Sequence, residues 1–233
     1  MKSSNFIIAL IVALLACFSS GIVLWLEYDL WAIACYAAIF LALPFASLMH
    51  ELGHILFGAI CKIKAVPKFS LFGSSSVQLI PKTDKNLRPK LIFTAMGGLA
   101  VNFIIIVISS LPIYFKVLPA WVTVFLPSSV YLFMLNLYGE NTDGRVLSNL
   151  IGKSNEAKVM LAVLTVQAQV LKGKPIEEAD EKLLFDLPVI REDDPAFISL
   201  TELRYEYFSA KGDAEQAEKY KSRLESLKVY IND

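Results

Sequence analysis

The sequence predicts an all-α membrane protein with about four transmembrane helices, a small membrane-associated β-hairpin and a soluble helical domain towards its C-terminal end. Of its 233 residues, 55% are hydrophobic, and the mean hydropathy is +0.54. The charged side chains are segregated, with 16 in residues 1–150 and 28 in residues 151–233. A soluble domain is about 25% charged throughout. This pattern excludes a single soluble globule, a disordered chain and a nucleic-acid-binding protein with a basic face, and we expect domains at 1–150 and 151–233.

Four apolar runs approach or exceed the roughly 20 residues that a helix needs to cross a bilayer. They cover residues 6–26, 30–61, 91–115 and 117–138. The first run follows Lys2 and could instead be the core of a cleaved signal peptide, but its length favours a retained helix.

The basic residues predict the orientation of these helices. The loop at 62–90 holds seven basic residues and one acidic residue. The charged residues of the loop after the first run are Glu27 and Asp29, both acidic. Basic loops stay on the cytoplasmic side of a membrane. We therefore expect the N-terminus, the 62–90 loop and the C-terminal domain in the cytoplasm, with the helices in the cell membrane.

The two histidines of the chain are His50 and His54, in the motif His50-Glu51-Leu52-Gly53-His54. Residues four apart share one face of a helix, so both imidazoles can bind one ion. Glu51 lies beside that face, where a carboxylate can take a proton from a water acidified by zinc. The spacing therefore predicts a zinc hydrolase site with Glu51 as the catalytic base.

The setting of this motif strengthens the prediction. Ionisable groups inside an apolar segment cost at least about 2.5–3.5 kcal/mol each when charged, so they are functional by default. Lys62 marks the expected cytoplasmic end of the helix, which places the histidine pair about 12–18 Å inside it.

A catalytic zinc ion usually takes three protein ligands. The chain has no third histidine, and its three cysteines form no CxxC pair, so the third ligand must be a carboxylate. Asp143, after the fourth apolar run, is the first candidate, and Glu140 is its rival. An ordinary helix-ending turn would also explain this Asn/Asp/Gly cluster.

An HExxH motif within an apolar, membrane-spanning run, followed by an Asn136…Asp143-Gly144 segment, resembles the site-2 protease family of intramembrane zinc metalloproteases. The resemblance covers about residues 30–150. It implies that the aspartate of the Asp-Gly pair, here Asp143, is the third zinc ligand.

The family also has a Gly-Pro-x-x-Asn segment between these motifs. Residues 98–102, Gly-Leu-Ala-Val-Asn, occupy that place here, with Leu99 where proline is usual. The resemblance implies that Asn102 lies near the active site and binds the substrate backbone; a hydrogen bond between helices is the alternative.

The remaining segments are predicted from local patterns. Alternation at 68–72 and 77–80 around a Gly-Ser turn predicts a β-hairpin, which would either offer an edge to an extended substrate or rest on lipid head groups. The C-terminal part predicts helices at 154–171, 175–185, 195–210 and 213–229. Gly212 suits a helix end, and Asp213 with Gln216 forms a capping-box-like start.

Two functions follow from these patterns. The first is an intramembrane zinc endopeptidase that cleaves transmembrane or membrane-tethered peptides near the cytoplasmic side. The second is a non-catalytic membrane adaptor that binds a partner through its helical tail. Both imply a lipid bilayer around the chain and no nucleic acid.

Overall fold

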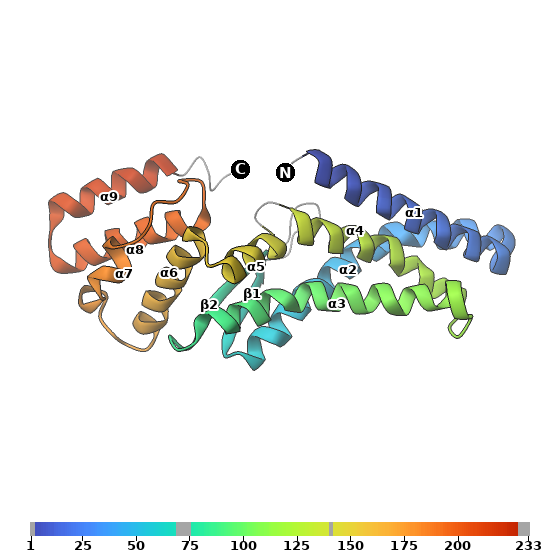
Figure 1. Cartoon of the computed structure of the whole chain (residues 1–233), viewed down its shortest axis with the longest axis horizontal. Helices are drawn as coiled ribbons and strands as arrows, with labels where there is room; N and C mark the ends of the chain where they lie inside the picture. Colours follow the sequence, from blue (N-terminus) through green and yellow to red (C-terminus); the bar gives the residue numbers. More distant parts are fainter. Residues whose placement is uncertain (1–2, 69–75, 140–141, 228–233) are drawn as a thin grey trace. The chain divides into compact units, whose positions relative to one another are not determined.

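The computed structural model describes residues 3–68, 76–139 and 142–227 and is mostly helical (Figure 1). Its α-helices are α1 (Ser3–Tyr28), α2 (Ala32–Ile60), α3 (Leu87–Phe115), α4 (Phe125–Tyr138), α5 (Asp143–Gly152), α6 (Asn155–Leu171), α7 (Glu181–Phe185), α8 (Pro195–Lys211) and α9 (Ala214–Leu227). Short 3-10 helices are η1 (Asp29–Trp31), η2 (Ala120–Val124) and η3 (Ile176–Glu178). The strands are β1 (Ile63–Lys68) and β2 (Ser76–Pro81).

Four helical segments among the described residues are long and apolar enough to cross a membrane, which confirms the predicted number. They are Phe6–Trp31, Ala34–Ile60, Leu87–Phe115 and Ala120–Gly152. The third begins four residues before the predicted start at 91. The fourth region is less regular than predicted, because η2 and α4 follow one another and α5 begins after them.

β1 and β2 pair into a two-stranded sheet, as the alternating pattern predicts. β1 covers Ile63–Lys68, a segment in which no strand was predicted before Lys68, and the side chain of Ile63 is buried. The predicted first strand at 68–72 lies, apart from Lys68, outside the described residues. The predicted turn at 73–76 lies largely outside the described residues.

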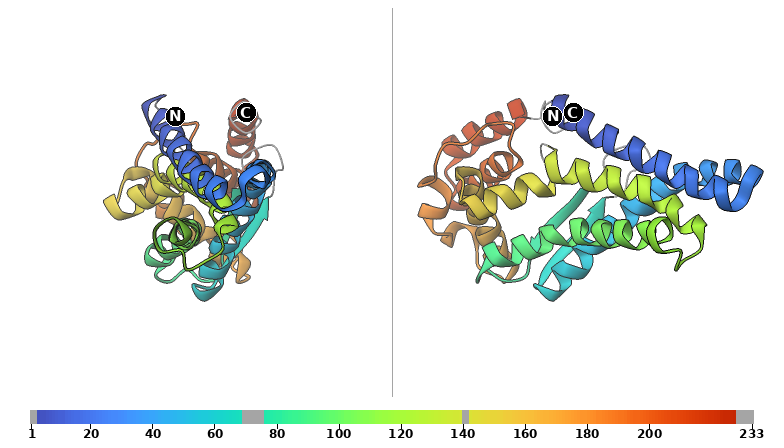
Figure 2. Two further views of the ribbon diagram at one scale, coloured as in Figure 1. Left: turned by 90° about the vertical axis from the view of Figure 1, so that its right-hand side faces the viewer. Right: turned by 45° about the vertical axis from the view of Figure 1, so that its right-hand side comes forward.

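The described chain divides into two compact units. The first contains residues up to Cys61, Ala65–Gln78 and Ile92–Leu147. In it α1, α2 and α4 pack on one another (Figure 2) around a cluster of buried apolar side chains. The hydroxyl of Ser20 also donates to the carbonyl of Thr123 at 3.1 Å, which satisfies a buried polar group in an apolar setting.

The backbones of α2 and α3 approach each other closely at two glycines. A Cβ atom built on Gly53 would lie 2.4 Å from the carbonyl oxygen of Gly97. A Cβ atom on Gly97 would lie 2.5 Å from the carbonyl oxygen of Gly53. Only glycine permits this approach, which brings the HExxH segment against α3.

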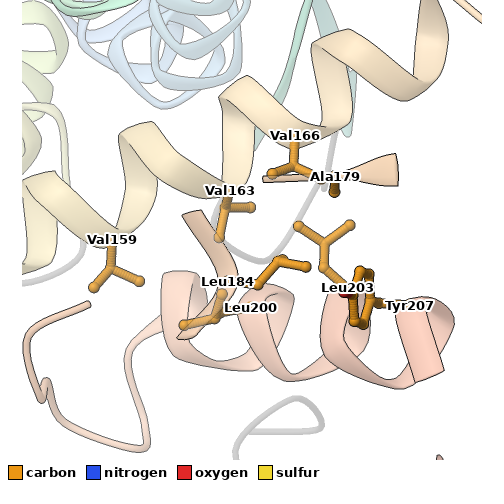
Figure 3. Packing of buried hydrophobic residues seen from close by; sticks show 8 residues of the cluster. All are labelled: Val159, Val163, Val166, Ala179, Leu184, Leu200, Leu203 and Tyr207. Carbon is orange, nitrogen blue, oxygen red and sulfur yellow. The ribbon is translucent and has the colours of Figure 1, made fainter. Parts of the chain in front are cut away.

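The second unit contains Lys62–Lys64, Leu79–Leu91 and Ser148–Asp233, of which the structure describes residues up to 227. Its core joins α6, α7 and α8, and Figure 3 shows the buried side chains facing one another. They are Val159, Val163, Val166, Ala179, Leu184, Leu200, Leu203 and Tyr207. Burial of this apolar surface is the main source of stability for such a small helical unit.

Capping contacts define the helix ends in this unit, and two of them lie where the sequence predicts, at Gly212 and Asp213. Ser154 caps α6 by accepting from the amide of Ala157. Gly212 ends α8 at φ 75°, and Asp213 accepts from the amide of Gln216 at the start of α9. One prediction was wrong: no single helix covers 175–185. The segment forms η3 and then α7, because Asp180 caps a new helix by accepting from the amide of Lys182.

The helix α5 was not predicted, because its first residues were interpreted as a turn. Arg88, in the first turn of α3, donates to the carbonyls of Leu150 and Ile151 at 2.7 and 2.9 Å. The last carbonyls of a helix have no partner within it, and a cation there also offsets the helix dipole. Arg88 therefore fixes the end of α5 to the start of α3.

Truncating the core of the second unit should destabilise it. Leu184 is fully buried, and Leu184→Ala should cost about 2–5 kcal/mol because it removes apolar contacts and leaves a cavity. We expect faster amide hydrogen exchange throughout α6 and α8 in the detergent-solubilised chain. The matched control is Val189→Ala, since Val189 is 91% exposed. Equal exchange in both variants would contradict the assigned core.

The stability of this unit should also depend on Glu181. Its carboxylate accepts from the hydroxyl of Tyr207 at 2.6 Å and from the ammonium of Lys211 at 3.1 Å, and these contacts lower its pKa. A lowered folded-state pKa stabilises the fold above the ordinary carboxyl pKa, and this contribution is lost as the pH falls through the lowered value. Glu181→Gln should therefore reduce the Tm at pH 7, and the gap to the parent should shrink by pH 3. A gap that is unchanged or wider at pH 3 would contradict the assignment.

Candidate metal centre

The helix α2 places His50 and His54 on one face, one turn apart. Both side chains are buried, with 4% and 5% exposed. The rings meet edge to face, with centroids 4.8 Å apart, and their Nε2 atoms lie 3.2 Å from each other. The two nitrogens therefore converge on one point, as the spacing of the motif predicts.

A carboxylate completes the group. Asp143 is the first residue of α5, and its Oδ2 atom lies 2.9 Å from Nε2 of His50 and 3.1 Å from Nε2 of His54. Among the described residues, His50, His54 and Asp143 form the one group of three that could hold a metal ion. The residue that the sequence favoured as third ligand thus lies beside both histidines.

The hydrogen bonds of His54 show which of its nitrogens carries the proton. Nδ1 lies 2.9 Å from the carbonyl oxygen of Thr94 on α3. A carbonyl oxygen only accepts, so Nδ1 must carry the proton, and Nε2 of the neutral ring presents a lone pair. This lone pair faces the carboxylate of Asp143. With a neutral ring, these two electron-rich atoms would be held together by a cation, whereas a protonated ring would donate from Nε2 to the carboxylate.

The distances fit a divalent metal ion. Ligand atoms about 2.0–2.1 Å from a tetrahedral zinc ion are separated from one another by about 3.3 Å. The three separations here, 2.9, 3.1 and 3.2 Å, are close to that value. Two imidazoles with one carboxylate are also a known ligand set of catalytic zinc sites.

Gly98 makes room for the two rings. A Cβ atom at this position would lie 2.5 Å from Nε2 of His54 and 2.6 Å from Nε2 of His50. The backbone of α3 therefore lies directly against the proposed metal-binding atoms, and no larger residue fits without moving the rings.

Glu51 follows His50 on α2 and is 5% exposed. Its carboxylate is near enough to His50, His54 and Asp143 to interact electrostatically with all three. A buried carboxylate that is not itself in the ligand group is suited to act as a general base beside a metal ion.

Comparison of the chain with protein-family models, with curated proteins and with solved structures gave no match. We therefore infer the function from the geometry of the site.

Of the other residues singled out in the sequence, one lies beside the ligand group, one does not contact it, and one is not described by the structure. Asn102 is fully buried on α3, and its amide lies 3.1 Å from Nδ1 of His50. Asn136 donates to the carbonyl of Leu132 in its own helix rather than to the ligand group. Glu140, the rival ligand, lies outside the described residues.

Sequence reasoning missed the role of Thr94 and the steric role of Gly98. Thr94 acts through its backbone carbonyl, which every residue has, so no side-chain pattern could identify it. Gly98 was noted as part of a family segment, but the pairing of α2 with α3 that gives it a role was not visible in the sequence.

Gly98→Ala should weaken zinc binding. The added methyl group must displace both imidazoles, and we expect a zinc affinity lower by about tenfold or more, the scale of losses when ligand orientation is disturbed. Competition with a chromophoric chelator measures the affinity. Gly152→Ala is the matched control, because a Cβ atom there meets nothing within 4 Å. Parent-like affinity in Gly98→Ala would contradict the assigned site.

The two candidate carboxylates can be separated by substitution. Asp143→Ala should abolish stoichiometric zinc in the purified protein, because two imidazoles alone hold the ion weakly. Glu140→Ala should retain it. Metal analysis of both variants checks this, and the reverse pattern would assign the third ligand to Glu140.

Proposed function

We propose that this chain is an intramembrane zinc endopeptidase that cuts transmembrane or membrane-tethered peptides near the cytoplasmic side of the membrane. One observation carries the proposal. The two histidines and the glutamate of an HExxH motif are buried in a helix apolar enough to cross a membrane, and an aspartate from a later helix meets both histidines.

The apolar setting supports a functional role for these groups. Each ionisable side chain at such a place lowers the stability of an inserted helix, so a chain keeps it where it binds an ion or reacts. With His54 neutral, its Nε2 lone pair and the carboxylate of Asp143 would repel each other without a cation. A bound divalent ion would offset both costs.

Peptide hydrolysis follows from the residues of the site. His50, His54 and Asp143 would hold zinc, which when bound supplies a Lewis acid that acidifies water and polarises a carbonyl. Glu51 would take a proton from the attacking water, whose oxygen bonds to the carbonyl carbon of the scissile peptide. Glu51 would then give this proton to the amine nitrogen as the carbon–nitrogen bond breaks.

The helices around the site favour a membrane peptide as substrate. Residues of the motif lie on a segment that a bilayer would surround, so a substrate must reach them from within or beside the membrane. The basic loop at 62–90 follows the motif helix directly, which favours cleavage near the cytoplasmic side.

Glu51→Gln should lower peptide cleavage by about 10²–10⁴-fold, the usual contribution of a general base, while zinc content stays at the parent level. The measurement compares membrane-peptide fragments in cells that express the parent or the variant, with zinc analysis of both purified proteins. Leu52→Ala, at the neighbouring and more exposed position, is the control. Cleavage by Glu51→Gln at the parent rate would refute the mechanism.

A non-catalytic membrane adaptor is the second candidate. Asn136 motivates it, because its amide bonds within α4 and takes no part in the ligand group. The two functions differ in metal content. Purified parent protein with one zinc ion per chain supports the protease, and protein without stoichiometric zinc supports the adaptor.

A further inference from the structure

The buried side chain of Asn102 has one amide atom without a hydrogen-bond partner, and this observation indicates its role. Its side chain is fully buried, and its amide nitrogen lies 3.1 Å from Nδ1 of His50. Its amide oxygen has no hydrogen-bond partner. A buried polar atom without a partner costs about 1–3 kcal/mol, so this arrangement calls for an explanation.

The chemistry of a metal-binding imidazole supplies one. When Nε2 of a neutral histidine offers its lone pair to an ion, the proton lies on Nδ1 and must be donated to an acceptor. An amide nitrogen cannot accept. A half-turn of the Asn102 carboxamide exchanges its oxygen and nitrogen with almost no change of shape, and it places the oxygen opposite Nδ1 of His50.

We propose that the amide oxygen of Asn102 accepts the Nδ1 proton of His50 and so fixes the ring with Nε2 directed at the metal. Asn102 is then a positioning residue of the metal centre rather than a residue that binds the substrate backbone. The proposal rests on the proposed zinc site. The half-turn brings the amide oxygen to a donor, and the amide nitrogen takes the former place of the oxygen.

The arrangement of α3 supports this assignment independently. Thr94, Gly98 and Asn102 are four residues apart, so they follow one face of the helix. Thr94 offers an acceptor to Nδ1 of His54, and Gly98 leaves room for the rings between them. Asn102 occupies the equivalent place opposite His50. One helical face thus presents a carbonyl, a gap and a carboxamide to two histidines that are also four residues apart.

The test uses three variants of the full-length chain, purified in detergent. Asn102→Leu keeps a similar branched shape but removes the acceptor, and it should weaken zinc binding by about 10–100-fold, as loss of such a partner does in other sites. Asn102→Asp restores a strong acceptor and should bind zinc within about threefold of the parent. Asn136→Leu, which removes an amide bonded only within its own helix, should bind zinc as the parent does.

Each result decides between the possible roles. If Asn102→Leu binds zinc as tightly as the parent, the positioning role is wrong, while the proposed zinc site stands. If Asn102→Asp loses as much affinity as Asn102→Leu, hydrogen-bond acceptance is not the function of this residue. A parent protein that binds no zinc would overturn both the positioning role and the proposed function. Rescue by aspartate together with loss in leucine also excludes a general folding defect as the cause.

Discussion

The close contact between α2 and α3 is the constraint on which the candidate site depends. The backbones meet at Gly53 and Gly97, and this approach brings the imidazoles of α2 against the face of α3 that holds them. Without it, the carbonyl of Thr94 could not reach His54, and two buried histidines would have free rings. The two glycines therefore allow the helices to approach, and this approach lets His54 contact the carbonyl of Thr94.

The third ligand depends on a different part of the chain. Asp143 begins α5, and a short helix in an apolar setting needs both of its ends satisfied. At its far end Arg88 binds the carbonyls of Leu150 and Ile151, so the helix that carries Asp143 is tied to α3. The same helix α3 thus supplies contacts to both histidines and an anchor for α5. Such supporting contacts hold a site to the narrow geometry that a metal ion requires.

Side-chain patterns predicted which residues form the candidate site better than they predicted the groups that hold those residues in place. The spacing of His50 and His54 within an apolar helix was sufficient to predict a convergent pair, and the need for a carboxylate pointed to Asp143. The four apolar helices and the helix-end signals at Gly212 and Asp213 were also predicted, because they depend on local sequence. The start of β1, the break at Asp180 and the helix α5 were not. At each of these places the local sequence is compatible with more than one backbone conformation, and packing against the rest of the chain selects one of them.

The residues of α3 that hold the two histidines in place were not predicted for a related reason. Thr94 contributes a backbone carbonyl and Gly98 contributes empty space, and neither leaves a signature in a single sequence. Asn102 was singled out correctly as a residue near the site, yet its predicted contact was with a substrate. Its observed neighbour is His50, which became visible only when α2 and α3 were placed side by side.

X-ray absorption at the zinc edge of the purified, zinc-loaded protein would show whether two imidazoles and one carboxylate of this chain bind a zinc ion. We expect one zinc ion per chain, with scattering from two imidazole rings and further light-atom ligands at about 2.0–2.1 Å. A shell of sulfur ligands near 2.3 Å, a spectrum without imidazole scattering, or zinc well below one ion per chain would contradict this assignment.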